Sequence, residues 1–474
     1  MTTTTAERRV ATPAGPHQRP GRGPLFVMLI GTFMTFLDFF IVNVALPSVQ
    51  GRLHASPAAV QFVVAGFALT FAVGLISGGR LGDIYGRRRV FGLGLTLFTL
   101  ASAACGLAPN AAFLVAARIV QGGAAALMTP QVLATLGTAY TGDKRARAFA
   151  AYGLTMGLAG VLGQLIGGGL IALNIAGAGW RSIFLINVPV GAAALLLLRR
   201  LVPESRGERA ALDLAGTALV TAGLTAIVLP LVEGRQQSWP LWTWLTLASA
   251  PVFLAAFVAH QRARGAAGRA PLIRLSVFRD RTFAVGTLTA VIFGGIPASF
   301  FFVLALYLQD GRHLSALFSG IVFTGVGVGY FAAMLLAERI TARLGRHILT
   351  VGAGFLTAAC LLLAASSGAA SSAELLPGLA LAGFGIGLVL VPLTAIVLSN
   401  LDASHAGAAS GVLSTALQVG GALGIAVIGV VFFGALPAGG FAHAFAVGLL
   451  ALAVPTVATV VLTRLLSRSG PAGP

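Results

Sequence analysis

A chain of 474 residues that is 57% hydrophobic and only 9% charged is too apolar for a water-soluble protein, and its mean hydropathy is +0.92. The composition therefore predicts a polytopic membrane protein and argues against a soluble enzyme. The 31 basic and 13 acidic residues give a net charge of +18, which is also typical of proteins that bind nucleic acid, so the positions of the basic residues decide between the two.

Fourteen apolar stretches are long enough to cross a bilayer, for which a helix needs about 20 residues. They cover roughly residues 25–47, 58–78, 90–108, 111–137, 148–173, 181–199, 213–233, 241–260, 282–308, 315–337, 346–367, 375–399, 406–434 and 441–465. The expected fold is an all-α integral membrane protein with 14 transmembrane helices.

The basic residues are strongly one-sided relative to these helices. With the N-terminus placed inside, 26 of them fall in cytoplasmic segments, four fall in external loops, and Arg118 lies within a helix. This is the positive-inside pattern, so the charge reports orientation and contact with an anionic leaflet. We expect a multi-pass protein of the inner (plasma) membrane with both termini cytoplasmic, and no nucleic-acid partner.

Residues 1–24 are rich in Thr, Pro, Gly and Arg and are expected to form a disordered cytoplasmic tail, and residues 467–474 are expected to form a second cytoplasmic tail. No convincing cleavage site follows the first apolar stretch, which is expected to remain as a signal-anchor. Cys105 and Cys360 fall in two distant predicted helices, which favours packing residues over a disulfide.

The first apolar stretch, Leu25 to Pro47, contains the sequence FLDFFIVNVALP and places the carboxylate of Asp38 inside a hydrophobic helix. About 13 residues at ~1.5 Å rise separate Asp38 from Leu25, so a position at the membrane interface is the less favoured alternative. An ionisable residue at membrane depth usually faces a cavity or a partner and marks an ion or substrate path. Asp38 is therefore the first candidate functional residue.

The connection between the second and third helices, Gly79 to Val90, reads GRLGDIYGRRRV. Gly82 and Gly86 would permit a sharp turn and a close approach of helices, and Asp83 is able to pair with an arginine of the loop or to cap a helix. The arginines at 87–89 would hold the loop in the cytoplasm. An ordinary positively charged loop is the alternative interpretation.

Here the chain resembles the major facilitator superfamily. The superfamily signature between helices two and three is matched at Gly79, Leu81, Gly82, Asp83, Gly86, Arg87 and Arg88, with departures at Ile84 and Tyr85. Three further segments resemble the fourteen-helix drug:proton antiporters of that superfamily. These are LDFFIVNVALP, with Asp38 and Asn43; RIVQGGAAALMTP, with Arg118, Gln121 and Gly122; and WRSIFLINVPVG from Trp180 to Gly191.

The fifth helix contains GLTMGLAGVLGQLIGGGL, from Gly153 to Leu170, which is similar to the antiporter motif of the superfamily. Gly163, Gly167 and Gly168 fit that motif, but Gln164 replaces its proline, so a kink cannot be assumed from ring geometry. Glycines at this spacing also serve close helix packing whatever the function.

The second half of the chain repeats the first weakly. Arg339, Gly345 and Arg346 correspond to Arg80, Gly86 and Arg87 at an offset of 259 (339 minus 80). A six-helix repeat needs about 200 residues, so the excess fits two added helices. We expect an N-terminal six-helix bundle at 25–200, two linking helices within 201–281, and a C-terminal six-helix bundle at 282–466, related by an axis along the membrane normal.

The resemblance implies a proton-coupled exporter that works as a monomer without a cofactor. Asp38 and Arg118, at similar predicted depths, would form its proton site, and Asp83 with the neighbouring arginines would act as a conformational latch. The candidate cavity-lining residues are polar or aromatic and deep: Asn43, Gln121, Gln131, Phe293, Phe300, Phe301 and Tyr330.

The expected cargo is a hydrophobic, neutral or singly charged organic molecule, because a dication would be best held by two deep carboxylates. Apart from Asp38, the helices offer only Glu233, Glu338 and Glu374 near their ends, with Asp310 expected in an external loop. A dedicated exporter of one metabolite or antibiotic made by the same cell is the main alternative. A non-transporting sensor and a membrane-embedded enzyme are weaker alternatives, and no metal-binding or catalytic motif favours an enzyme.

Overall fold

The computed structural model describes residues 22–207, 212–273, 275–398 and 403–466, and the regular structure within these ranges is entirely helical. Thirteen of the described helices are long and apolar enough to cross a membrane. The prediction of an all-α membrane protein is therefore confirmed. Most of the two predicted tails, residues 1–21 and 467–474, lies outside the described ranges.

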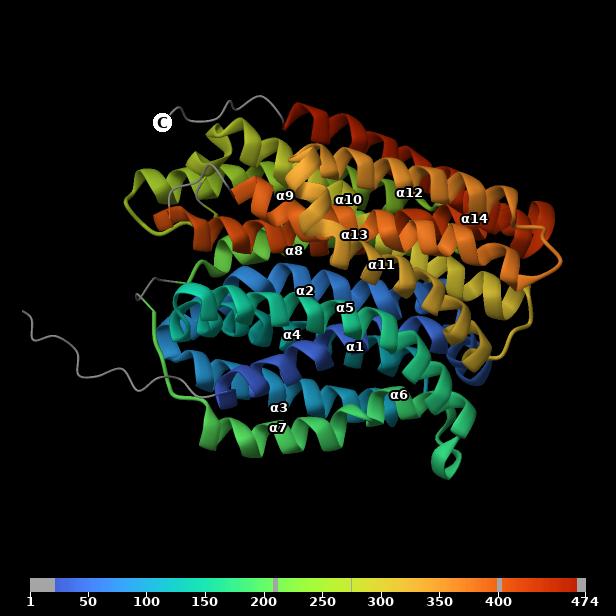
Figure 1. Cartoon of the computed structure of the whole chain (residues 1–474), viewed down its shortest axis with the longest axis horizontal. Coiled ribbons are helices and arrows are strands. Elements are labelled where there is room, and N and C mark those ends of the chain that lie inside the picture. The colour runs from blue at the N-terminus through green and yellow to red at the C-terminus, as the bar shows by residue number, and fades with distance from the viewer. Residues whose placement is uncertain (1–21, 208–211, 274, 399–402, 467–474) are drawn as a thin grey trace, which may run out of the picture.

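The first half of the chain forms one group of helices, α1 to α7 (Figure 1). Their bounds are α1 Arg22–Leu53, α2 Pro57–Tyr85, α3 Arg87–Gly106, α4 Ala111–Ala139, α5 Gly142–Leu173, the short α6 Ser182–Leu185 and α7 Asn187–Leu201. Helix α4 packs against α2 and α3, while α5 packs against α1. Ser56 and Asn110 cap α2 and α4, because each side chain accepts a backbone N–H of the first turn.

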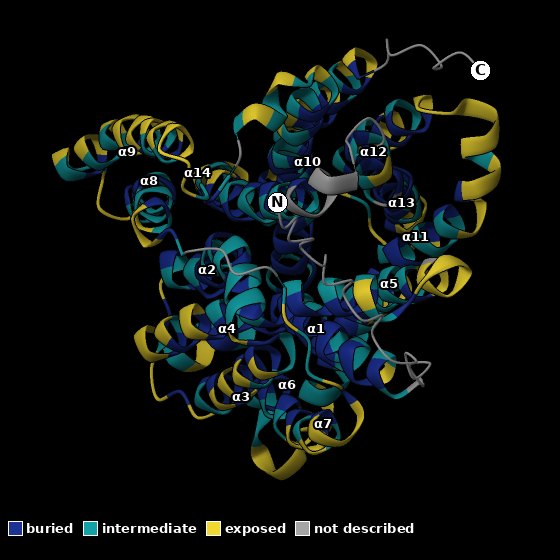
Figure 2. Cartoon of the chain, turned by 90° about the vertical axis from the view of Figure 1, so that its left-hand side faces the viewer, coloured by how far each residue is buried: buried dark blue, intermediate teal, exposed yellow. Residues whose placement is uncertain are grey.

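The second half forms the other group, with α8 and α9 at the periphery (Figure 2). The bounds are α8 Leu214–Glu233, α9 Leu241–Ala266, α10 Arg281–Leu306, α11 Ala316–Leu344, α12 His347–Ala365, α13 Leu376–Leu398 and α14 Ala403–Leu465. The two groups meet where α5 packs on α11 and α2 packs on α14. This grouping is the one expected for bundles joined by two linking helices, and the predicted domain boundaries themselves stay predictions.

Helix α14 is a single element of 63 residues whose backbone leaves the helical conformation at Gly439 and Gly440. Gly440 has φ +70°, in the left-handed region that favours glycine. A side-chain carbon added at Gly448 would lie 3.8 Å from Ile428, although the two residues would stand about 30 Å apart in a straight helix. The segment therefore folds back on itself. This reversal supports two crossings at 406–434 and 441–465, and the fourteenth helix stays a prediction.

Two predicted positions need correction. Of the two glycines expected to permit a sharp turn and close helix approach, only Gly86 forms the turn, with φ +107°, whereas Gly82 lies inside α2 and allows the close approach of Gln131 from α4. Asp310 was expected in an external loop, but it lies in a π-helical turn, Tyr307–Gly311, that continues α10, and it is half-buried. The predicted apolar stretch ended at residue 308, because the polar residues Gln309 and Asp310 of the turn interrupt the apolar pattern.

Candidate functional site

The centre of the first helix group is an ion pair between Asp38 of α1 and Arg118 of α4. Both side chains are fully buried, and Arg118 Nη1 donates to Asp38 Oδ2. The predicted meeting of these two residues is thus observed. Isolated charges would be very costly at this depth, and the pairing offsets part of that cost.

Three further polar side chains surround the carboxylate. Gln121 Nε2 and Asn187 Nδ2 both donate to Asp38 Oδ1, at 2.8 and 2.9 Å. The same two amide nitrogens donate to Ser102 Oγ, at 2.6 and 3.1 Å. The carboxylate is therefore held at one oxygen by two neutral amides and at the other by the guanidinium, so its two oxygens are chemically distinct.

The guanidinium of Arg118 has partners besides Asp38. Its Nε donates to Val63 O at 2.9 Å, and Nη1 also donates to Gln121 Oε1 at 2.7 Å. The group lies 4.3 Å from the ring centre of Phe67 and 5.7 Å from that of Phe184, within the range of cation–π attraction. Arg118 is thus held by groups that would remain if Asp38 became neutral.

Sequence reasoning identified Asp38, Arg118 and Gln121 but gave Ser102 no role. The available signal was one of three hydroxyl residues of the third helix, Thr96, Thr99 and Ser102, at a depth where a polar group needs a partner. Asn187 belongs to the segment WRSIFLINVPVG, yet its contact with Asp38 bridges 149 positions of sequence. Only the packing of α7 beside α1 brings the two together.

The predicted gating residues lie at the end of α2, at Gly86 and at the start of α3, and we call this stretch the gating loop. Arg87 Nη2 of α3 lies 3.1 Å from Asp83 Oδ1 of α2, across the turn at Gly86, and Arg87 also donates to Ala134 O and Thr138 Oγ1 of α4. Gly82 is buried against the side chain of Gln131. These contacts all lie within the first helix group. A contact of Asp83 or Arg87 with the second group, as a latch between the groups requires, is not among those of the described residues.

Glu204 is an acidic partner of this loop that the sequence did not reveal. It follows α7, and its Oε1 accepts the backbone N–H of Arg88 at 3.0 Å. Its Oε2 lies 3.8 Å from Arg88 Nε and 3.7 Å from Arg89 Nε. The next residue, Ser205, accepts the backbone N–H of Arg87 at 2.8 Å. Hydrogen bonds and ion pairs therefore hold the segment that follows α7 against the start of α3.

Asp213, which caps α8, forms a second polar cluster next to the membrane-spanning segments. It accepts from His260 at 2.8 Å, from Gln261 at 2.8 Å and from the backbone N–H of Gly216 at 3.0 Å, and it lies 3.6 Å from Arg264. Burial alone would raise the pKa of this carboxyl group, but these donors and the Arg264 charge outweigh burial and lower the pKa to about 2.

This lowered pKa predicts an effect on stability. A carboxyl group whose pKa falls on folding stabilises the protein above its ordinary pKa, and the effect is lost as pH falls through the folded-state pKa. Asp213→Asn should lower the free energy of unfolding by about 2 kcal/mol at pH 7. Thermal unfolding in detergent should show about half of that difference at pH 3. An unchanged difference at pH 3 would contradict the assigned contacts.

The predicted glycine face of α5 lies between α1 and α11. Gly163 faces the α1 backbone, where an added side-chain carbon would be 3.4 Å from Ile41 N. Gly167 faces Ile41 and Val44, while a side chain at Gly168 would collide with Ala316 O of α11. Gln164 Nε2 donates to Phe40 O at 2.7 Å. These residues let α5 approach closely both α1 of its own group and α11 of the second group. Their part in antiport stays a prediction.

The candidate cavity-lining residues do not form one cluster. Phe293 and Phe300 are fully buried in the apolar core, and Gln131 donates to Gly78 O between α4 and α2. Phe301 contacts Phe40, and Tyr330 lies against Gly157 of α5. The structure gives Gln131 a packing contact with α2, whereas Phe301 and Tyr330 lie where the two groups meet. Within the described ranges, no cluster of His, Cys, Asp and Glu that could hold a metal is found.

A bundle of membrane-spanning helices that buries a paired carboxylate between neutral amides is the architecture of a secondary transporter. Residues 28–425 match the family model of the Major Facilitator Superfamily, and the chain belongs to this family. It is therefore a multi-pass membrane transporter and not an enzyme.

Two relatives agree with this family assignment, and a solved structure agrees with the fold. The chain is 38% identical over 432 residues to the probable actinorhodin transporter of Streptomyces coelicolor, covering 90% of this chain and 75% of that protein. It is 35% identical over 405 residues to the multidrug resistance protein Stp of Mycobacterium tuberculosis, covering 84% and 74%. A crystal structure of a D-xylose-proton symporter shares the fold, with a TM-score of 0.66 at 16% identity, covering 95% and 98% of the two chains.

Proposed function

We propose that this transporter exports a hydrophobic, neutral or singly charged organic molecule in exchange for protons. The observation that carries the proposal is the buried Asp38–Arg118 pair with its amide donors. Asp38 is the only fully buried carboxylate within a membrane-spanning helix of the described residues, which suits one proton and disfavours a dication as cargo. Relatives named for antibiotic transport and multidrug resistance support export.

Exchange follows from two states of the Asp38 carboxyl group. A nearby guanidinium favours the ionised form, whereas burial away from that charge favours the neutral acid. A proton that reaches Asp38 from outside would release Arg118, which retains Val63 O and Gln121 as partners. Rocking of the two helix groups would then expose Asp38 to the cytoplasm, where deprotonation restores the ion pair and admits the substrate.

A dedicated exporter of an antibiotic made by the same cell is the second candidate. It is favoured by the 38% identity to a probable actinorhodin transporter. Proteoliposomes with an imposed pH gradient, assayed against lipophilic dyes, monocations and dications, separate the candidates. Accumulation of several neutral or monocationic compounds supports multidrug export, and saturation by one compound alone supports the dedicated exporter. Strong exchange of dications would contradict the charge argument.

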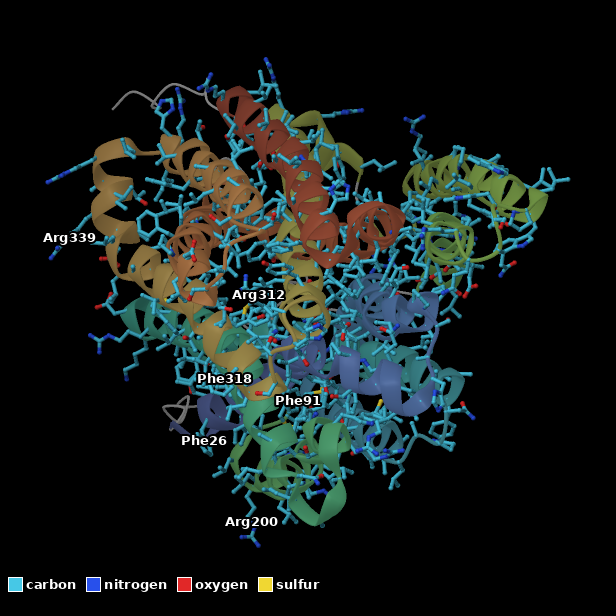
Figure 3. The ribbon with its side chains drawn as sticks, turned by 90° about the vertical axis from the view of Figure 1, so that its right-hand side faces the viewer. Phe26, Phe91, Arg200, Arg312, Phe318 and Arg339 are labelled. Atoms are coloured by element: carbon cyan, nitrogen blue, oxygen red, sulfur yellow. The ribbon has the colours of Figure 1, made fainter. Side chains whose placement is uncertain are left out.

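We propose that the protein is located in the plasma membrane. It would act there as a monomer with both termini in the cytoplasm. Arg200 and Arg339, near the ends of α7 and α11, are exposed and point away from the helices (Figure 3), as expected for a cytoplasmic basic rim. A cysteine introduced at residue 468, in a variant lacking Cys105 and Cys360, should react only with reagent applied to the cytoplasmic side. Reaction from outside would reverse the proposed orientation.

The gating loop should control the rate of cycling more than substrate affinity. Asp83→Asn removes the charge paired with Arg87, and Glu204→Gln removes the charge near Arg88 and Arg89. Both pairs are partly exposed and contribute up to about 1 kcal/mol each, so both variants should fold. We expect slower transport with a Kd for substrate within about threefold of the original, measured by uptake and equilibrium binding. An equal loss in rate and affinity would indicate a purely structural loop.

A further inference from the structure

Two buried amide side chains lie side by side at one backbone carbonyl. Asn43 of α1 and Gln164 of α5 donate to Phe40 O, at 3.0 and 2.7 Å. Only 2% of Asn43 and 1% of Gln164 is exposed. A carbonyl oxygen can only accept, so both amide groups direct their nitrogens toward Phe40 O, and each is left with its oxygen.

The leftover atoms are two hydrogen-bond acceptors. Asn43 Oδ1 and Gln164 Oε1 are buried, and neither accepts a hydrogen bond from any residue that the structure describes. A buried polar group without a partner costs about 1–3 kcal/mol. Apolar residues of similar size would avoid this cost, so the pair of acceptors indicates a donor that arrives from elsewhere.

Aromatic rings from the second helix group contact the side chain of the same residue, Phe40, whose carbonyl group the two amides bind. Phe301 of α10 lies 5.4 Å from the ring of Phe40, and Phe323 of α11 stacks on Phe301 at 5.6 Å with planes 13° apart. The amide acceptors therefore come from one helix group and the stacked rings from the other. A molecule held here would be enclosed by both groups, which is the requirement for alternating access.

We propose that Asn43 and Gln164 accept hydrogen bonds from the transported molecule and select substrates that carry N–H or O–H donors on an aromatic framework. This inference rests on the proposed function and adds a chemical class to it. When α1 and α5 separate from α10 and α11, the substrate enters between the amides and the rings. Closure around a donor-bearing substrate satisfies both acceptors, whereas closure on the empty site leaves them without partners.

Two lipophilic monocations provide a matched pair of probes. Ethidium carries exocyclic amino groups that donate hydrogen bonds, and tetraphenylphosphonium has no donor. Dissociation constants of both are measured for the full chain in detergent, for Asn43→Leu and for Gln164→Met. Neither variant removes the hydrogen bond that Phe40 O accepts within α1, so both should fold, which elution as a single species checks.

Each variant should weaken ethidium binding about tenfold and leave tetraphenylphosphonium binding within about twofold. The control is Gln261→Met, which removes another buried amide that donates to an aspartate far from this place, and it should change neither constant. Unchanged ethidium affinity, or an equal loss for both probes, would overturn the assignment of Asn43 and Gln164. Failure of the unmodified protein to bind either probe would instead overturn the proposed multidrug function, and the inference with it.

Discussion

Asp38→Asn is expected to reduce substrate accumulation driven by a pH gradient to the level of protein-free liposomes. An asparagine amide neither takes up nor releases a proton at the pH values of the assay, so the proton half of the exchange is lost. The amide oxygen can still accept from Gln121 and Asn187. The amide nitrogen that replaces Oδ2 cannot accept from Arg118, which retains Val63 O and Gln121 Oε1 as partners. Substrate counterflow, in which labelled substrate exchanges for unlabelled substrate without net proton movement, should therefore persist.

The two assays together distinguish loss of coupling from loss of folding. Counterflow that survives while gradient-driven accumulation disappears would place Asp38 in proton coupling. Loss of both activities, with normal elution from a sizing column, would give Asp38 a role in the conformational cycle itself. Undiminished accumulation would remove Asp38 from the mechanism.

Arg118→Met should produce the largest loss of stability in the chain. Removal of one partner leaves the Asp38 carboxylate buried without a countercharge, and breaking such pairs costs about 3–5 kcal/mol. The variant also loses the stacking of the guanidinium on Phe67. The double variant Asp38→Asn/Arg118→Met contains no buried charge at this site and should recover most of that loss.

Thermal unfolding of the two single variants and the double variant gives the coupling free energy directly. A strongly non-additive cycle, with the double variant more stable than Arg118→Met alone, is the expected result. Additive losses would mean that the two side chains do not interact energetically in the folded protein.

The sequence predicted the fold and the central ion pair for a physical reason. Helix length and the side of each basic residue follow from the thickness and charge of a bilayer, and both are visible in a linear sequence. Asp38 was identified because a charge at membrane depth is rare enough to require a partner. Arg118 was identified from the resemblance of its segment to a motif of the drug:proton antiporters, and its depth supported the pairing. The meeting of these two residues required only their depths and not the detailed packing of the helices.

The missed features depend on contacts across long stretches of chain. Glu204 lies in a polar connection that resembles any cytoplasmic loop until its contacts with Arg88 and Arg89 are known. Ser102 gains its role because α3 packs against both α4 and α7, which bring Gln121 and Asn187 to its hydroxyl group. Gln131 had the right chemistry for a cavity, but its position on α4 turns it toward the α2 backbone. Depth alone does not determine which way a side chain on a helix faces.

The exchange of substrate for protons is tested most directly by recording both fluxes in one preparation. Proteoliposomes that contain a trapped pH-sensitive dye are given a substrate gradient, with no imposed pH gradient and with the membrane potential clamped. We expect a proton flux opposite to the substrate flux, which stops when substrate is absent and is missing in Asp38→Asn. Substrate movement without any change of internal pH would contradict proton-coupled export.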